Sequence, residues 1–267
     1  MLRPRAFERG ADIDMSYLNI LGVALSVLNL NTALGAIVEA LEKKSKGYIC
    51  VTGVHGVMEA QSDPQFRAIL NGAFLNTPDG IPMVWVGKLR GFKEMDRVYG
   101  PDLMLLAAEA SVQRGFTHFL YGGGDGVADQ LKARLEQKFP GIRIVGTYTP
   151  PFRPLNSTEE SELIARVNGL RPDIIWVGLS TPKQEKFMAQ YASRLNATLM
   201  FGVGAAFDFH AGRIRQAPRW IQRSGLEWFF RLCCEPRRLW KRYFKNNPLF
   251  VWKILGQFLG WKKYSLD

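Results

Sequence analysis

Residues 117–147 read THFLYGGGDGVADQLKARLEQKFPGIRIVGT, and this stretch decides the fold. The apolar run from Thr117 to Tyr121 is typical of a buried strand, and Gly126 to Phe139 has the length and pattern of an amphipathic helix. A second short apolar run, Ile142 to Thr147, follows the helix. A strand, a helix and a strand in this order predict a βαβ unit, whose two strands run parallel.

The same alternation continues toward both ends of the chain. We expect further strands at Leu18–Ala24, Tyr48–Thr52, Ala73–Asn76, Asp173–Gly178 and Thr198–Val203. We expect helices at Asn31–Lys44, Ile81–Arg90, Ser157–Leu170 and Pro182–Leu195, with another that opens at Pro101-Asp102. Such a series predicts an α/β fold: a Rossmann-like, mostly parallel sheet with helices on both faces. A basic, aromatic and helical C-terminal appendage follows it.

The charge of the chain is concentrated in that last segment. The whole chain of 267 residues has a formal net charge of +11. Residues 1–212 hold 22 Lys and Arg against 21 Asp and Glu, whereas residues 213–267 hold 13 against 3. The segment 213–267 also carries five of the seven Trp. We therefore expect a mobile leader at 1–15, an α/β domain at 16–212 and an appendage at 213–267.

The cysteines, histidines and apolar runs limit which cellular compartment and which kind of site are expected. The three cysteines, Cys50, Cys233 and Cys234, are too few for a disulfide framework, which favours a reducing cytoplasm. The best candidate for a membrane span, residues 249–261, is interrupted by polar residues and is shorter than the roughly 20 residues that a spanning helix needs. The histidines are widely spaced and no CxxC or HExxH motif occurs, so we expect no metal site.

The loops that follow the predicted strands are where a ligand is expected. In open parallel sheets, ligands bind beyond the carboxyl ends of the strands. We therefore expect five loops to converge, at residues 52–55, 77–80, 122–126, 178–184 and 202–208.

Each loop offers a chemical group together with a plain structural alternative. The glycines at 122–126 suit either a phosphate at a helix N-terminus or a tight turn with positive φ. Asp79 stands on a Pro-Asp-Gly turn that is either structural or catalytic, and Arg97 could meet a phosphate or a carboxylate. Gln184 falls in the first turn of a helix. Asp208, between two Phe, has either a perturbed pKa or a capping role.

In order and spacing, the loop motifs together resemble the WecG/TagA/CpsF family of bacterial glycosyltransferases. The motifs are Ile20-Leu21-Gly22-Val23, Thr77-Pro78-Asp79-Gly80, Arg97-Val98-Tyr99-Gly100, Pro182-Lys183-Gln184-Glu185 and the run from Gly202 to Asp208. The tail adds Ala217-Pro218-Arg219-Trp220, Gly225-Leu226-Glu227-Trp228 and the run from Arg231 to Trp240. The resemblance covers residues 18 to 245.

What the resemblance implies is an inverting, metal-independent transfer of a sugar. The donor is a UDP-sugar, no cofactor is needed, and the acceptor is an undecaprenyl-diphosphate-linked saccharide of exopolysaccharide or cell-wall polymer synthesis. It implies Asp79 as general base and Arg97 beside it. Substrate-binding positions would be Thr52, His55, Thr77, Gly123, Gly124, Gln184, Asp208, Arg231, Arg238 and Lys241. Family members often carry Thr-x-Asn after the second strand; here Val54 stands in the Asn position, so that contact is either missing or replaced by His55.

Three interpretations compete for the tail. Basic residues among aromatics suit nucleic acid, but an interfacial helix on an anionic membrane explains both the charge and the bulk of the last 25 residues. For Trp220, Trp228 and Phe229, packing on the body of the protein is an equal alternative. We expect a peripheral protein on the cytoplasmic face of the plasma membrane that binds no nucleic acid. A homo-oligomer stays open, since a tail that closes one site could reach that of a neighbour.

Two other functions stay open from the residues alone. The Gly122–Gly126 turn would also suit an NAD-dependent sugar-nucleotide oxidoreductase. The basic tail would suit a non-catalytic nucleic-acid-binding protein, although the near-neutral body disfavours a broad nucleic-acid face.

Overall fold

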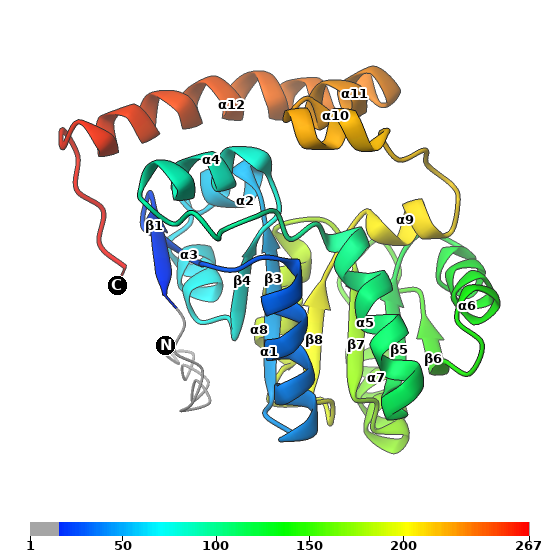
Figure 1. Cartoon of the computed structure of the whole chain (residues 1–267). Coiled ribbons are helices and arrows are strands. Elements are labelled where there is room, and N and C mark those ends of the chain that lie inside the picture. Colours follow the sequence, from blue (N-terminus) through cyan, green and yellow to red (C-terminus); the bar gives the residue numbers. More distant parts are fainter. Residues whose placement is uncertain (1–15, 267) are drawn as a thin grey trace.

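The fold is built around a six-stranded sheet, seen in a computed structural model that describes residues 16–266 (Figure 1). Its strand order is β4–β3–β8–β7–β5–β6, and all neighbours are parallel. The strands are β3 (Gly47–Thr52), β4 (Leu75–Pro78), β5 (Thr117–Gly122), β6 (Arg143–Tyr148), β7 (Ile174–Gly178) and β8 (Leu199–Gly202). The predicted Rossmann-like α/β fold is confirmed, while the expected leader at 1–15 lies outside the described residues.

Helices cover both faces of the sheet. One face is packed by α1 (Leu30–Glu42), α5 (Gly100–Arg114) and α6 (Val127–Lys138), and the other by α3 (Pro64–Asn71), α7 (Ser157–Leu170) and α8 (Lys183–Tyr191). Successive side chains of a strand point to opposite faces. In β7, Ile174 and Trp176 therefore join one hydrophobic cluster, and Ile175 and Val177 join the other. Both faces of the sheet are core.

The predicted single strand at Leu18–Ala24 is wrong. These residues form an antiparallel hairpin of β1 (Tyr17–Ile20) and β2 (Val23–Ser26). Leu21 and Gly22 have φ angles of 53° and 84°, the left-handed region that reverses a chain in a two-residue turn. The apolar run predicted a strand correctly at each end but did not show the reversal between them.

Three short helices begin directly at the carboxyl edge of the sheet. They are α2 (Val54–Glu59) after β3, α4 (Ile81–Leu89) after β4 and α9 (Ala206–His210) after β8. The strand predicted at Ala73–Asn76 is displaced, since β4 runs to Pro78 and pairs Thr77 with Val51. A proline is tolerated there because β4 is an edge strand of this sheet.

The C-terminal segment is helical and lies over the carboxyl edge. It contains α10 (Arg219–Ser224), α11 (Glu227–Cys234) and the long α12 (Pro236–Phe258), which crosses above α2 and α4 (Figure 1). Phe250 and Ile254 of α12 are buried in the core cluster, whereas Trp220 and Phe229 are 69% and 53% exposed, so these two do not pack on the body. None of the helices within residues 16–266 is both long and apolar enough to cross a membrane.

Candidate active site

A cavity of about 1720 Å³ lies at the carboxyl edge of the sheet, beneath α12. Residues from all five loops that the sequence singled out line it, among them His55, Asp79, Gly124, Gln184 and Asp208. The C-terminal segment supplies the opposite wall through α11 and α12. The cavity is therefore shared between the sheet and the appendage.

Asp79 is placed by the end of β4. Its backbone N–H donates to the carbonyl of Thr52 on the neighbouring strand at 3.1 Å, which fixes the turn. The side chain is 33% exposed, and the residue lines the cavity. Burial raises the pKa of this carboxyl group, the positive charge of Arg97 opposes that rise, and the negative charge of Glu227 adds to it. A carboxyl group with a raised pKa at a cavity wall suits proton transfer.

Arg97 bridges Asp79 and the C-terminal segment. Its Nε donates to the backbone carbonyl of Asp79, and its Nη2 lies 3.9 Å from Oδ1 of the same residue. The stronger contact is with Glu227, whose Oε2 is 2.7 Å from Nη2. The guanidinium also stacks 4.0 Å above the ring of Tyr99. Although burial disfavours the charge, the two carboxylates hold the pKa of Arg97 above its ordinary value.

Glu227 is a site residue that the sequence reasoning missed. It begins α11, is 8% exposed, and accepts a hydrogen bond of 2.9 Å from the hydroxyl of Tyr99 through Oε1. It is one of only three acidic residues in the basic segment 213–267. The scarcity of carboxylates among so many cations is the signal that could have found it.

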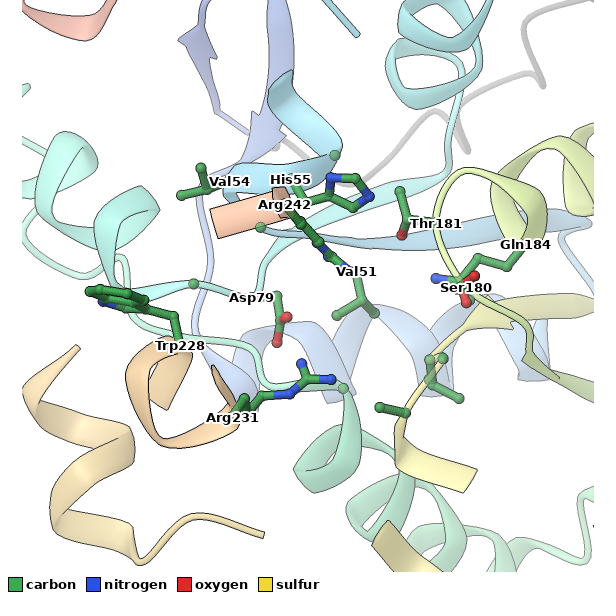
Figure 2. A pocket seen from close by; sticks show the side chains of 18 of the residues that line it. Val51, Val54, His55, Asp79, Ser180, Thr181, Gln184, Trp228, Arg231 and Arg242 are labelled. Carbon is green, nitrogen blue, oxygen red and sulfur yellow. The ribbon is translucent and has the colours of Figure 1, made fainter. Parts of the chain in front are cut away.

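Three arginines of the C-terminal segment, Arg231, Arg238 and Arg242, line the opposite wall of the cavity. Figure 2 shows Asp79, Arg231 and Arg242 reaching into the cavity from three different elements. Burial, together with repulsion from Arg231 and Arg238, lowers the pKa of Arg242 to about 10. Its Nε is buried and has no hydrogen-bond partner among the described residues. Converging cations with an unpaired donor make a site for an anion.

Lys241 was predicted to join this set, but the structure does not place it at the cavity wall. Lys241 is exposed and is absent from the cavity wall; its Nζ lies 5.6 Å from the ring centroid of Trp240. Arg238 and Arg242 are four residues apart and share one face of α12, so the residue before Arg242 is turned away. Arg242, the next residue, lines the cavity instead.

Gln184 and Asp208 lie in the cavity as predicted. The Gln184 side chain is 3% exposed, and its Nε2 donates to Oε1 of Glu185 at 3.0 Å. Its Oε1 is buried and has no hydrogen-bond partner among the described residues. Burial raises the pKa of Asp208, while Arg238, Arg213 and Arg231 oppose the rise.

His55 connects the cavity to α12. Its imidazole donates to the carbonyl of Thr181, and its Nδ1 lies 3.1 Å from Nδ2 of Asn246. Burial and the charge of Arg242 lower the pKa of His55 to about 4. The ring is therefore neutral near pH 7, and its Nδ1 accepts a hydrogen bond from the Asn246 amide. His55 lines the cavity as predicted, with a contact that also secures α12.

Thr52 and Thr77 were predicted to contact substrate, and neither lines the cavity. They are 3% and 0% exposed, and the hydroxyl of Thr77 lies 3.4 Å from the carbonyl of Cys50 as a donor. Both residues lie within strands, so their side chains are held against the sheet's packing rather than presented by a loop. For Thr77 the predicted strand Ala73–Asn76 ended too early, since β4 runs to Pro78, whereas Thr52 ends β3 as predicted.

The glycine-rich turn after β5 has a structural cause. Gly122 and Gly123 have φ angles of 123° and 77°, and a Cβ on Gly122 would lie 2.7 Å from the backbone of Gly178. The interpretation as a tight turn with positive φ is thus confirmed. Gly123 and Gly124 do line the cavity, where their contact with a ligand stays a prediction.

The described residues also answer two questions about the kind of site. They contain no group of three or more His, Cys, Asp or Glu that could hold a metal ion. Arg231 and Arg242 of the tail reach into the cavity, which disfavours a nucleic-acid surface made from these two (Figure 2).

Fold and cavity together define a class: α/β proteins with a ligand cavity, here lined by arginines, at the carboxyl edge of a parallel sheet. Residues 18–264 match the model of the glycosyl transferase WecG/TagA/CpsF family, and the chain therefore belongs to this family. The matched range includes both the sheet and the C-terminal helices. The resemblance found in the motifs is confirmed, and the protein is a glycosyltransferase rather than an oxidoreductase.

Two relatives carry the same name, N-acetylglucosaminyldiphosphoundecaprenol N-acetyl-beta-D-mannosaminyltransferase. The protein of Bacillus spizizenii is 31% identical over 213 residues, which cover 79% of this chain and 80% of the relative. The protein of Bacillus subtilis is 29% identical over 233 residues, which cover 85% of this chain and 88% of the relative. The similarity extends over most of each protein.

Proposed function

We propose that this protein transfers a sugar from a UDP-sugar to a saccharide linked through a diphosphate to undecaprenol, in the synthesis of a cell-wall polymer or exopolysaccharide. The observation that carries the proposal is the carboxyl group of Asp79 facing a cavity whose opposite wall holds Arg231, Arg238 and Arg242. The names of the two relatives describe transfer of an N-acetylmannosaminyl group to a lipid-diphosphate-linked sugar. An N-acetylhexosamine is accordingly the first donor sugar to test.

The proposed reaction is a single displacement at the anomeric carbon. Asp79 takes the proton of an acceptor hydroxyl, whose oxygen forms the new bond to that carbon. The bond from the anomeric carbon to the donor's phosphate oxygen breaks, and UDP leaves with the electron pair. Attack opposite the leaving group inverts the configuration. The raised pKa of Asp79 supports this role, because a stronger base accepts the proton more readily.

The arginines are proposed to neutralise the charge that grows on the departing UDP. Guanidinium groups bind phosphates through paired N–H donors, and such contacts are strong in a partly dry cavity. The unpaired Nε of Arg242 supports this, as a buried donor with no partner among the described residues. We propose that these cations take the place of a metal ion.

The remaining polar groups are proposed to hold the donor. The free Oε1 of Gln184 would accept a hydrogen bond from a sugar hydroxyl or amide, and Asp208 would accept another. Gly123 and Gly124, with no side chains, leave room for close approach of the nucleotide. His55 would help to hold the donor indirectly, because its contact with Asn246 ties α12 to the loop that follows β3.

The outer face of the appendage is proposed to rest on an anionic membrane surface, on the cytoplasmic side. Trp252 and Trp261 are 64% and 67% exposed, and their rings lie 6.0 Å apart. Lys245, Lys262 and Lys263 are exposed in the same C-terminal region. Aromatic side chains with flanking lysines suit the headgroup region.

A donor screen tests the proposal. The full-length protein is incubated with a panel of UDP-hexoses, UDP-N-acetylhexosamines and UDP-uronic acids, together with a lipid-diphosphate-linked N-acetylglucosamine. We expect one donor to give a product that is heavier by one sugar, with release of UDP. Absence of product with every donor, while NAD binds tightly in calorimetry, would contradict the proposal.

A further inference from the structure

Glu185 is a buried acid beside the cavity to which the proposed reaction gives no role. It follows Gln184 in the first turn of α8 and is 1% exposed. Unlike Gln184 and Thr181, it does not line the cavity. A carboxyl group is stable in such a buried place only when other groups hydrogen-bond to it, so its partners indicate what it does.

Two hydrogen-bond partners of Glu185 come from residues that do line the cavity. Its Oε1 accepts a hydrogen bond of 2.9 Å from the hydroxyl of Thr181 and one of 3.0 Å from Nε2 of Gln184. Figure 2 shows Thr181 and Gln184 on the side of the pocket away from Trp228 and Arg231. Both donors therefore direct a hydrogen at one buried oxygen behind the cavity wall.

The contact with Glu185 determines which end of the Gln184 amide faces the carboxyl group. If the amide were turned over, its Oε1 would lie beside Oε1 of Glu185, and the lone pairs of the two oxygens would repel each other. Burial raises the pKa of Glu185, and the hydrogen bonds from Gln184 and Thr181 oppose that rise. Oε1 of Glu185 can accept in either protonation state, because a proton can be carried on Oε2. The Gln184 amide is thus left with its oxygen as the group for a ligand.

Two glycines, at the end of β8 and just after it, provide the space in which this amide lies. A Cβ on Gly202 would lie 3.1 Å from Nε2 of Gln184, and a Cβ on Gly204 would lie 3.3 Å from its Oε1. The amide therefore packs close to the backbone, and a side chain at either position would push it away. Packed on one side and hydrogen-bonded at its nitrogen, the amide has one defined orientation.

An acceptor oxygen at this place favours one part of a nucleotide sugar over another. Phosphate oxygens are themselves acceptors and would repel it, whereas hydroxyl and amide N–H groups can donate to it. Only β3 separates β8 from β4, the strand that Asp79 follows. Two strand spacings amount to about 10 Å, which leaves room for a sugar ring between the proposed base and the Gln184 amide.

We infer that Glu185 is a positioning residue, which holds the Gln184 amide so that its oxygen accepts a hydrogen bond from a hydroxyl or amide N–H of the transferred sugar. The inference rests on the proposed function, which places a UDP-sugar in this cavity. Glu185 acts through Gln184 and does not itself touch the sugar. Recognition of the sugar should therefore depend on Glu185, while recognition of the UDP portion should not.

The experiment compares the binding of two ligands by calorimetric titration. One is UDP, and the other is the UDP-hexose or UDP-N-acetylhexosamine that the wild-type chain binds most tightly. Glu185→Met keeps the length of the side chain and removes both oxygens, so the Gln184 amide can turn. We expect the Kd of the UDP-sugar to rise about fivefold or more, as for a lost hydrogen bond, and the Kd of UDP not to rise. Gln184→Met should give the same pattern without any change at Glu185.

A double variant separates positioning from a general structural role. In the Gln184→Met background, Glu185→Met should cause little further loss, because the carboxyl group acts through the amide. Asp129→Ala is the matched control. Asp129 lies in the first turn of α6 and accepts a hydrogen bond of 2.7 Å from the hydroxyl of Thr147, but it does not line the cavity. This control should bind both ligands as the wild type does.

Three results would overturn the inference. The first is a UDP-sugar affinity that Glu185→Met or Gln184→Met leaves unchanged. The second is an equal loss of UDP affinity, which would assign the hydrogen bond to the nucleoside. The third is a pair of losses that add in the double variant, which would give Glu185 a role independent of Gln184. A wild-type chain that binds none of the UDP-sugars would instead contradict the proposed function.

Discussion

Oε2 of Glu227 lies 2.7 Å from Nη2 of Arg97, whereas Oδ1 of Asp79 lies 3.9 Å from the same nitrogen. A residue of the C-terminal segment therefore holds the closest ion pair of the arginine beside the proposed base. This leaves the Asp79 carboxylate less neutralised than it would be in a direct pair with Arg97. The negative charge of Glu227 also raises the pKa of Asp79. The appendage thus contributes to the strength of the base.

We predict that Glu227→Gln lowers the pKa of Asp79, because it removes a like charge and releases Arg97 toward Asp79. The acidic limb of the pH profile of kcat/KM should move to lower pH, and kcat should fall about tenfold as the base weakens. Tyr99→Phe is the control, since it removes the hydrogen bond to Glu227 without changing a charge. An acidic limb that stays in place in Glu227→Gln would refute the assigned role.

The arginines that line the cavity predict that two neighbouring cations of α12, Arg242 and Lys241, contribute differently to the affinity for UDP. Arg242→Ala should weaken binding of UDP by about tenfold or more, since a hydrogen bond to a charged group contributes about 1.5–3 kcal/mol. Lys241→Ala removes the same charge from the adjacent, outward position and should leave the affinity nearly unchanged. Calorimetric titration with UDP measures both. Equal losses of UDP affinity in the two variants would contradict this prediction, because the affinity would then depend only on net charge.

If the outer face of the appendage rests on an anionic membrane, substitutions on that face should weaken vesicle binding and leave the fold intact. Trp252→Ser together with Trp261→Ser should reduce sedimentation with anionic vesicles, because the two exposed rings would no longer enter the headgroup region. Added salt should weaken the remaining binding. Leu170→Ser, an exposed apolar residue at the end of α7, serves as control. Unchanged vesicle binding in the double variant would place the membrane surface elsewhere.

His55 predicts how stability depends on pH. Its pKa is lowered from 6.5 to about 4 in the folded chain, by burial and by Arg242, with Glu59 also nearby at 3.6 Å. Below pH 6.5 the unfolded chain binds a proton that the folded chain does not, so acidification favours unfolding until about pH 4. We therefore compare the free energy of unfolding of the wild type with that of His55→Gln. The difference, wild type minus variant, should fall by at most about 3 kcal/mol as the pH is lowered from 6.5 to 4. Denaturant titrations at several pH values measure it. A constant difference would contradict the pKa.

The sequence predicted those features that are local. Alternation of apolar runs and amphipathic stretches placed the central strands within a few residues, because each strand is buried on both faces and flanked by turn residues. The rule that ligands bind at the carboxyl edge then brought together Asp79, Gln184 and Asp208. Asp79 directly follows β4, and Gln184 and Asp208 lie in the first turns of the helices that come after β7 and β8, so their position depends on topology rather than on side-chain detail.

What the sequence did not predict depends on contacts between distant segments. The pairing of Glu227 with Arg97 joins residues 130 positions apart, and no local pattern indicates it. The choice between Lys241 and Arg242 depends on the rotation of α12 about its axis, which the packing of Asn246 on His55 sets. The reversal at Leu21 and Gly22 was hidden in an apolar run that looked continuous.

The central claim, that Asp79 deprotonates the acceptor, is tested most directly by Asp79→Asn. The amide keeps the shape of the side chain and cannot take up the proton. Transfer from the donor that the screen identifies to lipid-diphosphate-linked N-acetylglucosamine is measured for both proteins, with UDP affinity measured beside it. The account predicts that Asp79→Asn loses at least about a thousandfold in kcat, while UDP still binds with nearly wild-type affinity. Turnover close to that of the wild type would contradict it.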